Sequence, residues 1–138
     1  MRRAIIMLAT LLVTLTTSNF AQDTKKDRHK KTFIYTEMMK VTASAYCSIP
    51  KETDDTPFLA AWGNILKPSV KSIAISRDLF DFGLTNGKRV HIDGIEGEFI
   101  VLDVMHKKWK NKIDIYMGLD RKKALKFGRK KVTIRWEL

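Results

Sequence analysis

The chain has 138 residues, and its 26 Lys and Arg against 15 Asp and Glu give a formal net charge of +11. This length leaves room for one domain, and the single cysteine excludes an intramolecular disulfide, so core packing must hold the fold. A strongly basic surface favours anionic partners: nucleic acid, anionic lipid or the acidic polymers of a cell envelope.

The N-terminus has the pattern of an export signal. Arg2 and Arg3 precede an apolar run over residues 4–15, and Ala21 is a small residue suited to cleavage. We therefore predict a signal peptide over residues 1–21 and a protein exported to the periplasm, the cell envelope or the medium. Export argues against nucleic acid as the natural partner. The run is shorter than the ~20 residues that span a bilayer, so we expect no stable membrane span after cleavage; an uncleaved anchor is the alternative.

Residues 22–38 are polar and basic and show no sustained apolar period, which predicts a flexible basic linker. The domain proper is then expected over residues 39–138. Asp54 and Asp55 lie in a stretch rich in Pro, Thr and Asp, and we interpret them as turn-forming residues.

The remaining chain alternates between apolar and polar residues in short runs, which predicts a mainly β domain of about six strands. The Asn86-Gly87 pair is a strong turn signal. One helix is expected after Asp120, an N-cap, and should end at Gly128. A further helical turn is predicted over residues 77–82. The strands are expected over residues 39–46, 70–75, 88–92, 98–103, 113–116 and 132–136, which suit a small closed barrel.

Two of these strands carry an aspartate among apolar residues, Asp103 and Asp114. A buried carboxylate is costly unless it is paired, hydrogen-bonded or protonated. Such surroundings raise a carboxyl pKa, as a general acid at neutral pH requires. The alternative is that strand alternation turns both side chains to water.

The segments around both aspartates resemble the signature of the three-aspartate (3D) domain, the catalytic barrel of membrane-bound lytic transglycosylase A and of small secreted stationary-phase survival proteins. The signature has an aspartate, a short loop and an Asp-Ile-Tyr segment, and the two aspartates here are eleven positions apart, as in the family. Further similar segments occur in family order: Ser-Ala-Tyr-Cys at 44–47, Ala-Trp-Gly at 61–63, Leu-Lys-Pro at 66–68 and Phe-Gly-Arg-Lys-Lys-Val at 127–132.

The resemblance implies a six-stranded double-psi β-barrel with one or two short helices. It also implies a lytic transglycosylase that cleaves the β-1,4 bond between N-acetylmuramic acid (MurNAc) and N-acetylglucosamine (GlcNAc) of peptidoglycan and leaves a 1,6-anhydro product. Asp103 would be the acid and base, and Asp114 would orient the site and tune the pKa of Asp103. The reaction needs no cofactor, and the sequence has no His/Cys cluster with metal-ligand spacing.

The chain departs from the family pattern at three places. Ser76 stands where the first family aspartate is expected, Met105 and His106 replace two glycines, and Trp109 replaces a lysine. We assign substrate binding to Ser76, His106 and Trp109; Trp109 would stack on a sugar ring or cap the barrel, and His106 would be a substitute acid or base or an exposed loop residue. Two aromatic residues complete the predicted binding set, Tyr46 and Trp62, although Tyr46 fits the barrel core equally well.

These departures keep two further functions open: a non-catalytic barrel that binds cell-wall glycan, and a barrel similar to rare lipoprotein A and expansins that acts through another site. The expected partner is in each case the peptidoglycan glycan strand, and we expect a monomer.

Overall fold

The computed structural model describes residues 34–49 and 58–138. The predicted signal peptide, most of the predicted linker, and Asp54 and Asp55 lie outside the described residues. Within the described ranges, no helix is both long and apolar enough to cross a membrane.

Strands dominate this part of the chain, and the helical segments are short. The elements in chain order are β1 (Glu37–Tyr46), η1 (Ala61–Gly63), β2 (Ser72–Ile75), η2 (Arg77–Phe82), β3 (Arg89–Ile92), β4 (Glu98–Val104), β5 (Lys112–Tyr116), α1 (Arg121–Phe127) and β6 (Lys130–Trp136), where η marks a 3₁₀ helix.

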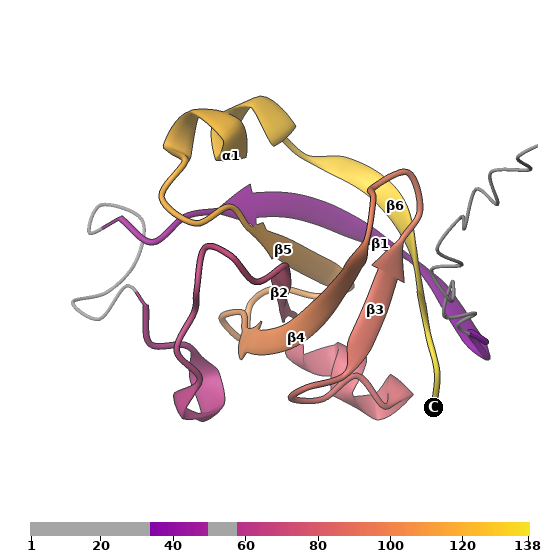
Figure 1. Cartoon of the computed structure of the whole chain (residues 1–138). Helices are drawn as coiled ribbons and strands as arrows, with labels where there is room; N and C mark the ends of the chain where they lie inside the picture. The colour runs from indigo at the N-terminus through magenta and orange to yellow at the C-terminus, as the bar shows by residue number, and fades with distance from the viewer. Residues whose placement is uncertain (1–33, 50–57) are drawn as a thin grey trace, which may run out of the picture. The chain divides into compact units, whose positions relative to one another are not determined.

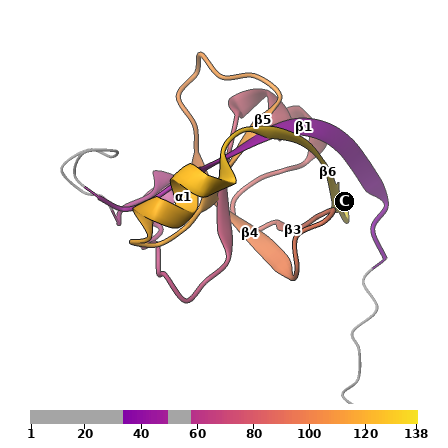
Figure 2. The same cartoon turned by 90° about the horizontal axis from the view of Figure 1, so that it is seen from above.

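The six strands form a closed barrel in the order β1-β5-β2-β4-β3-β6. β1 pairs with β5, and β2 with β4, in parallel; the other four pairs are antiparallel. The long β1 runs beside β6, and α1 lies beside β1 between β5 and β6 (Figures 1 and 2). The predicted mainly β, six-stranded double-psi barrel with few short helices is confirmed.

Strand alternation fills the barrel interior with aliphatic side chains. Ile73 and Ile75 of β2 and Ile113 and Ile115 of β5 are buried in one cluster, so the residues between them face outward. Each fully buried Val, Leu or Ile stabilises the fold by roughly 1.5–3 kcal/mol. The other members come from β1, β3, β4, β6, η2 and the loop after η2: Val41, Ala43, Leu79, Leu84, Val90, Ile92, Phe99, Val101, Ile134 and Trp136.

An extra residue in β4 decides where Asp103 points. Ile73 pairs with Val101 but the next residue, Ala74, pairs with Asp103, so Leu102 is an insertion in the register. In a regular strand, Asp103 would share the face of Val101, which is the apolar interior. A β-bulge re-aims the side chain that follows it, and Asp103 therefore lies beside Ala74 on the outer face.

The element boundaries largely follow the sequence prediction. β1 begins at Glu37, which pairs with Trp136 of β6. The last two residues of the predicted linker, Glu37 and Met38, therefore belong to the barrel. β2 begins at Ser72, later than the predicted residue 70. The helix α1 has the predicted N-cap, since Asp120 Oδ1 accepts a hydrogen bond of 2.8 Å from the Lys123 amide.

Candidate functional site

The two aspartates lie in one row that crosses four neighbouring strands on the outer face of the barrel. Ser44 of β1 pairs with Asp114 of β5, Asp114 with Ala74 of β2, and Ala74 with Asp103 of β4. We call these four residues the carboxylate row. Two strand spacings separate the Cα atoms of the aspartates, about 9–10 Å if the sheet were flat. Both aspartates are half-buried, so the row is reachable from solvent.

Asp103 is held by three hydrogen-bond donors. Its Oδ1 accepts from the backbone amides of Ala61 and Val104, each at 2.8 Å, and its Oδ2 accepts from the Tyr46 hydroxyl at 3.2 Å. Backbone amides can only donate, so Oδ1 is fixed as an acceptor. This network orients the Asp103 carboxylate and attaches the first residue of η1 to the bulge of β4.

Asp114 has a different environment. Burial raises the pKa of its carboxyl, and the negative charge of Asp103 acts in the same direction. A 2.9 Å hydrogen bond from Ser44 Oγ to Oδ1 and the nearby charges of Lys112 and Arg129 oppose this rise without cancelling it. Within the described residues, no hydrogen bond is made to Oδ2, which leaves one oxygen of Asp114 available to a ligand.

A short irregular segment is fastened over the outer face beside Asp103. Asn64 Nδ2 donates to the Leu102 carbonyl at 2.9 Å and to the Asn86 side chain at 2.8 Å, and the Ala60 amide donates to the Asn64 carbonyl. Trp62, at its tip, has a left-handed φ of 61°, a conformation that costs an L-residue roughly 1–2 kcal/mol. The surrounding hydrogen bonds hold it there.

The Trp62 side chain is 45% exposed, and its ring lies 5.9 Å from that of Phe80. A sugar ring can stack on aromatic surface that is open to solvent, and the residue before Trp62, Ala61, bonds to Asp103. The predicted binding role of Trp62 is therefore compatible with its position.

Tyr46 lies outside the barrel core. It packs in a second cluster with Leu102, Ala60, Leu66 and Tyr116, and its ring is 5.3 Å from that of Tyr116. Burial raises the pKa of the Tyr46 hydroxyl, and the Asp103 charge raises it further, so the group remains a donor at neutral pH. Tyr46 thus contacts a predicted catalytic residue directly.

Ser76 has no solvent-exposed surface. Its Oγ accepts a hydrogen bond of 2.9 Å from the Lys112 amide, and its own amide donates to the Lys112 carbonyl. The strand β2 ends at Ile75, so Asp78 falls in η2, where its Oδ2 accepts a 2.8 Å bond from the Asn111 amide. In this structure Ser76 and Asp78 anchor the start of β5 and the loop before it.

The β4–β5 loop carries the two other predicted binding residues. His106 is exposed, and its Nδ1 accepts a hydrogen bond from the Lys108 amide at 3.2 Å. Trp109 is half-buried and lies against several cationic side chains. Among the described residues, no group of three or more His, Cys, Asp or Glu is placed to hold a metal ion.

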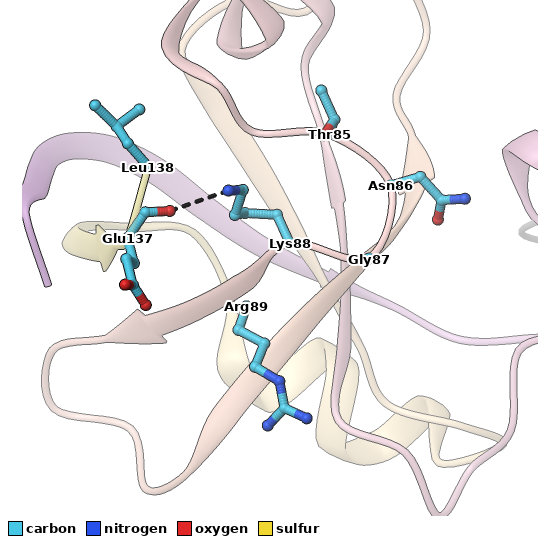
Figure 3. A pocket seen from close by; sticks show the side chains of 7 residues that line it. All are labelled: Thr85, Asn86, Gly87, Lys88, Arg89, Glu137 and Leu138. Atoms are coloured by element: carbon cyan, nitrogen blue, oxygen red, sulfur yellow. Dashed lines mark hydrogen bonds between the residues drawn. The ribbon is translucent and has the colours of Figure 1, made fainter. Parts of the chain in front are cut away.

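Two hollows lie away from the carboxylate row. One, of about 450 Å³, is lined by Thr85 to Arg89 and by Glu137 and Leu138; in Figure 3, Lys88 Nζ donates to the Glu137 carbonyl at 3.1 Å. The other, of about 590 Å³, is lined by Lys71, Phe99, Tyr116, Phe127 and neighbouring residues. Neither is lined by Asp103 or Asp114.

No family model matches the chain, and no curated protein matches it. Among solved structures, the Streptomyces papain inhibitor is similar, with 17% identity, a TM-score of 0.51, and 75% of this chain and 97% of that chain covered. That likeness shows the fold alone. An apo expansin of Clavibacter michiganensis matches at 14% identity and a TM-score of 0.45, over 71% of this chain and 49% of that chain. A mutant of this expansin in complex with cellohexaose matches at 11% identity, with the same TM-score and coverage.

Sequence reasoning missed three contributors to the site. Ser44, Lys112 and the Ala61 amide all contact or influence the two aspartates. Alternation along β1 and β5 could have placed Ser44 and Lys112 on the outer face with Asp114. No sequence signal identifies the Ala61 amide, because a backbone donor carries no residue signature.

Proposed function

We propose that the protein is an exported member of the three-aspartate group and a peptidoglycan lytic transglycosylase that uses the carboxylate row. The observation that carries the proposal is the asymmetry between the two aspartates. Asp103 is fixed as an acceptor by three donors, whereas burial raises the pKa of Asp114 and leaves its Oδ2 open. Paired carboxyl groups in environments this different suit separate roles in acid–base chemistry.

In this reaction a single carboxylic acid protonates the oxygen of the glycosidic bond between MurNAc and GlcNAc as that bond breaks. The resulting carboxylate then takes the proton of the sugar's own 6-hydroxyl, whose oxygen attacks C1 and closes the 1,6-anhydro ring. The acid is regenerated, and no water is consumed. One residue therefore serves first as acid and then as base.

The structure favours Asp114 for this role. The resemblance assigned it to Asp103, but the backbone donors on Asp103 Oδ1 suit a fixed, orienting carboxylate better than one that gives and takes a proton. The negative charge of Asp103 disfavours a second negative charge on Asp114, which keeps Asp114 protonated to higher pH. Asp103 would thus raise the pKa of Asp114 and orient the site, and Asp114 would transfer the proton.

A second candidate function uses the same surface without catalysis. Ser76, at the position of the first family aspartate, is completely buried and bonded to the backbone of Lys112, so it supplies no third carboxyl group to the row. A barrel that has lost this group and retained exposed Trp62 and half-buried Trp109 would bind wall glycan as a module.

Digestion of purified peptidoglycan, with mass spectrometry of the released muropeptides, tests the proposal. Asp114→Asn should lower anhydro-muropeptide release by about 100- to 10,000-fold, the usual loss of an acid–base catalyst. Asp103→Asn keeps an oxygen for the Ala61 amide and should be milder. Asp120→Asn is the matched control, since it removes the same charge at an N-cap where Asn is as good as Asp.

The variants separate the candidates. If wild type releases nothing above the Asp114→Asn background, the enzyme proposal fails, and co-sedimentation with purified sacculi then tests the binding module. If Asp103→Asn is inactive while Asp114→Asn retains activity, the two roles are reversed.

A further inference from the structure

Three cationic side chains gather around a single indole ring beside Asp114. Lys112 Nζ lies 3.9 Å from the centre of the Trp109 ring, Lys108 Nζ 5.2 Å and Arg129 Cζ 5.8 Å. We call these three side chains the cation cluster. They come from the β4–β5 loop, the start of β5 and the turn between α1 and β6, so the fold rather than one charged run brings them together.

Lys112 is the unusual member. Its residue is only 6% exposed, and its Nζ makes no hydrogen bond or ion pair with any of the described residues. Burial lowers the pKa of its ammonium group, and the neighbouring charges of Arg129 and Lys108 add to this effect. A buried charge is normally paired, but this ammonium group lies on a ring among other cations with no acidic group bonded to it among the described residues.

The protein itself supplies too little negative charge to balance the cluster. Asp114 lies two residues along β5 on the same outer face, and among the described residues it is the acidic group whose charge opposes the fall in the pKa of Lys112. Asp78 of η2 is bonded to the Asn111 amide, and this bond and the charge of Lys110 lower the pKa of its carboxyl. Neither Lys108 nor Arg129 forms an ion pair within the described part of the chain.

We infer that Lys108, Lys112 and Arg129, held around Trp109, form a carboxylate-binding subsite that seats an acidic wall glycan next to Asp114. The inference rests on the proposed function for the neighbouring carboxylate row. The Trp109 ring holds the three cations together, and they supply charge-assisted donors for the carboxylate of the glycan. That carboxylate is either the lactyl group of MurNAc or the end of its stem peptide.

Occupation of this subsite also acts on the chemistry. Lys112 and Arg129 both oppose the rise in the pKa of Asp114. A carboxylate bound between them offsets their charge, so Asp114 holds its proton more firmly when an acidic substrate is in place.

An NMR titration with sodium lactate tests the subsite without any glycan. The Trp109 indole resonance, assigned with a Trp109→Phe sample, should shift saturably with lactate and not with sodium chloride at equal ionic strength. Arg129→Gln and Lys112→Met should each weaken the response about tenfold or more, as expected for a lost charge-assisted hydrogen bond. Lys122→Gln, an exposed helix lysine, is the control and should behave as wild type.

A shift that grows linearly and equally with lactate and chloride would overturn the subsite, as would equal responses from all variants. Arg129 is exposed, so Arg129→Gln remains informative even if Lys112→Met does not fold.

Calorimetry with three glycans then identifies the source of the carboxylate: a GlcNAc–MurNAc tetrasaccharide with free lactyl groups, the same sugar with stem peptides, and neutral chitotetraose. The subsite predicts that one or both acidic sugars bind about tenfold tighter than chitotetraose, and that Arg129→Gln removes the difference. Equal binding of all three would overturn the subsite and leave the glycan function standing. Lactate binding without binding of any glycan would overturn the glycan function and leave a carboxylate-binding site standing.

Discussion

Asp114→Asn is expected to stabilise the barrel at neutral pH while it abolishes glycan cleavage. Burial raises the pKa of Asp114 in the folded protein, so the ionised carboxylate costs free energy that the unfolded chain does not pay. Each unit of pKa difference corresponds to about 1.4 kcal/mol. Asparagine has nearly the same shape, carries no charge and keeps an oxygen to accept from Ser44.

The stabilisation by Asp114→Asn should depend on pH. Because the folded-state pKa of Asp114 is higher than the unfolded-state value, the destabilisation is fully present above the folded-state pKa. It disappears as the pH falls below the unfolded-state value of about 3.9. The variant should therefore melt above wild type at neutral pH, by about 4–8 °C for each kcal/mol in a domain of this size, and together with wild type in acid.

Thermal unfolding followed by circular dichroism from acid to neutral pH measures this difference. Asp120→Asn is again the control, because it changes the net charge equally at an exposed helix cap. Two results would show that burial does not raise the pKa of Asp114: a variant that melts below wild type at neutral pH, or a difference that does not depend on pH. Either result would refute the assignment of Asp114 as the acid.

Three further outcomes follow from the contacts. Tyr46→Phe removes a donor to Asp103 and should cost about 1 kcal/mol in denaturant unfolding and lower muropeptide release; unchanged values would show that the bond is unimportant. Asp103→Ala leaves the Ala61 amide without its acceptor, which should cost about 1–3 kcal/mol and speed hydrogen exchange at that amide. Asp120→Ala removes the N-cap bond to the Lys123 amide, which should lower the free energy of unfolding by about 1 kcal/mol without changing muropeptide release. A loss of muropeptide release would link α1 to the site.

Much of the fold was predictable because the barrel is built from local patterns. Alternation along β1, β4 and β5 and the cap of α1 by Asp120 follow directly from residue type and spacing. The double-psi barrel was expected from the resemblance rather than from these patterns, and the strand order with its two parallel pairs is seen in the structure alone.

The position of Asp103 was not predictable in the same way. Simple alternation places it beside Val101 in the apolar interior, and only the inserted Leu102 turns it outward. A bulge depends on the register of the neighbouring strand, which the local sequence does not specify. The sequence also left open whether Tyr46 belongs to the core. In the structure it lies outside the core, and its hydroxyl bonds to Asp103.

The different surroundings of the two aspartates were equally hidden in the sequence. Both have apolar neighbours in the sequence, so the sequence alone treats them alike. The difference comes from the fold: the Ala61 amide bonds to Asp103, whereas burial raises the pKa of the Asp114 carboxyl and the charge of Asp103 adds to that rise. These contacts are the ground on which we propose Asp114, in place of Asp103, as the proton donor.

The central claim is that the carboxylate row cleaves peptidoglycan without water, and digestion in isotopically labelled water tests it most directly. The account predicts that wild type releases muropeptides ending in 1,6-anhydro MurNAc with no label in the new end, and that Asp114→Asn releases none. Muropeptides with a labelled reducing end would show a hydrolase, and no release from wild type would show that the row does not cleave the glycan.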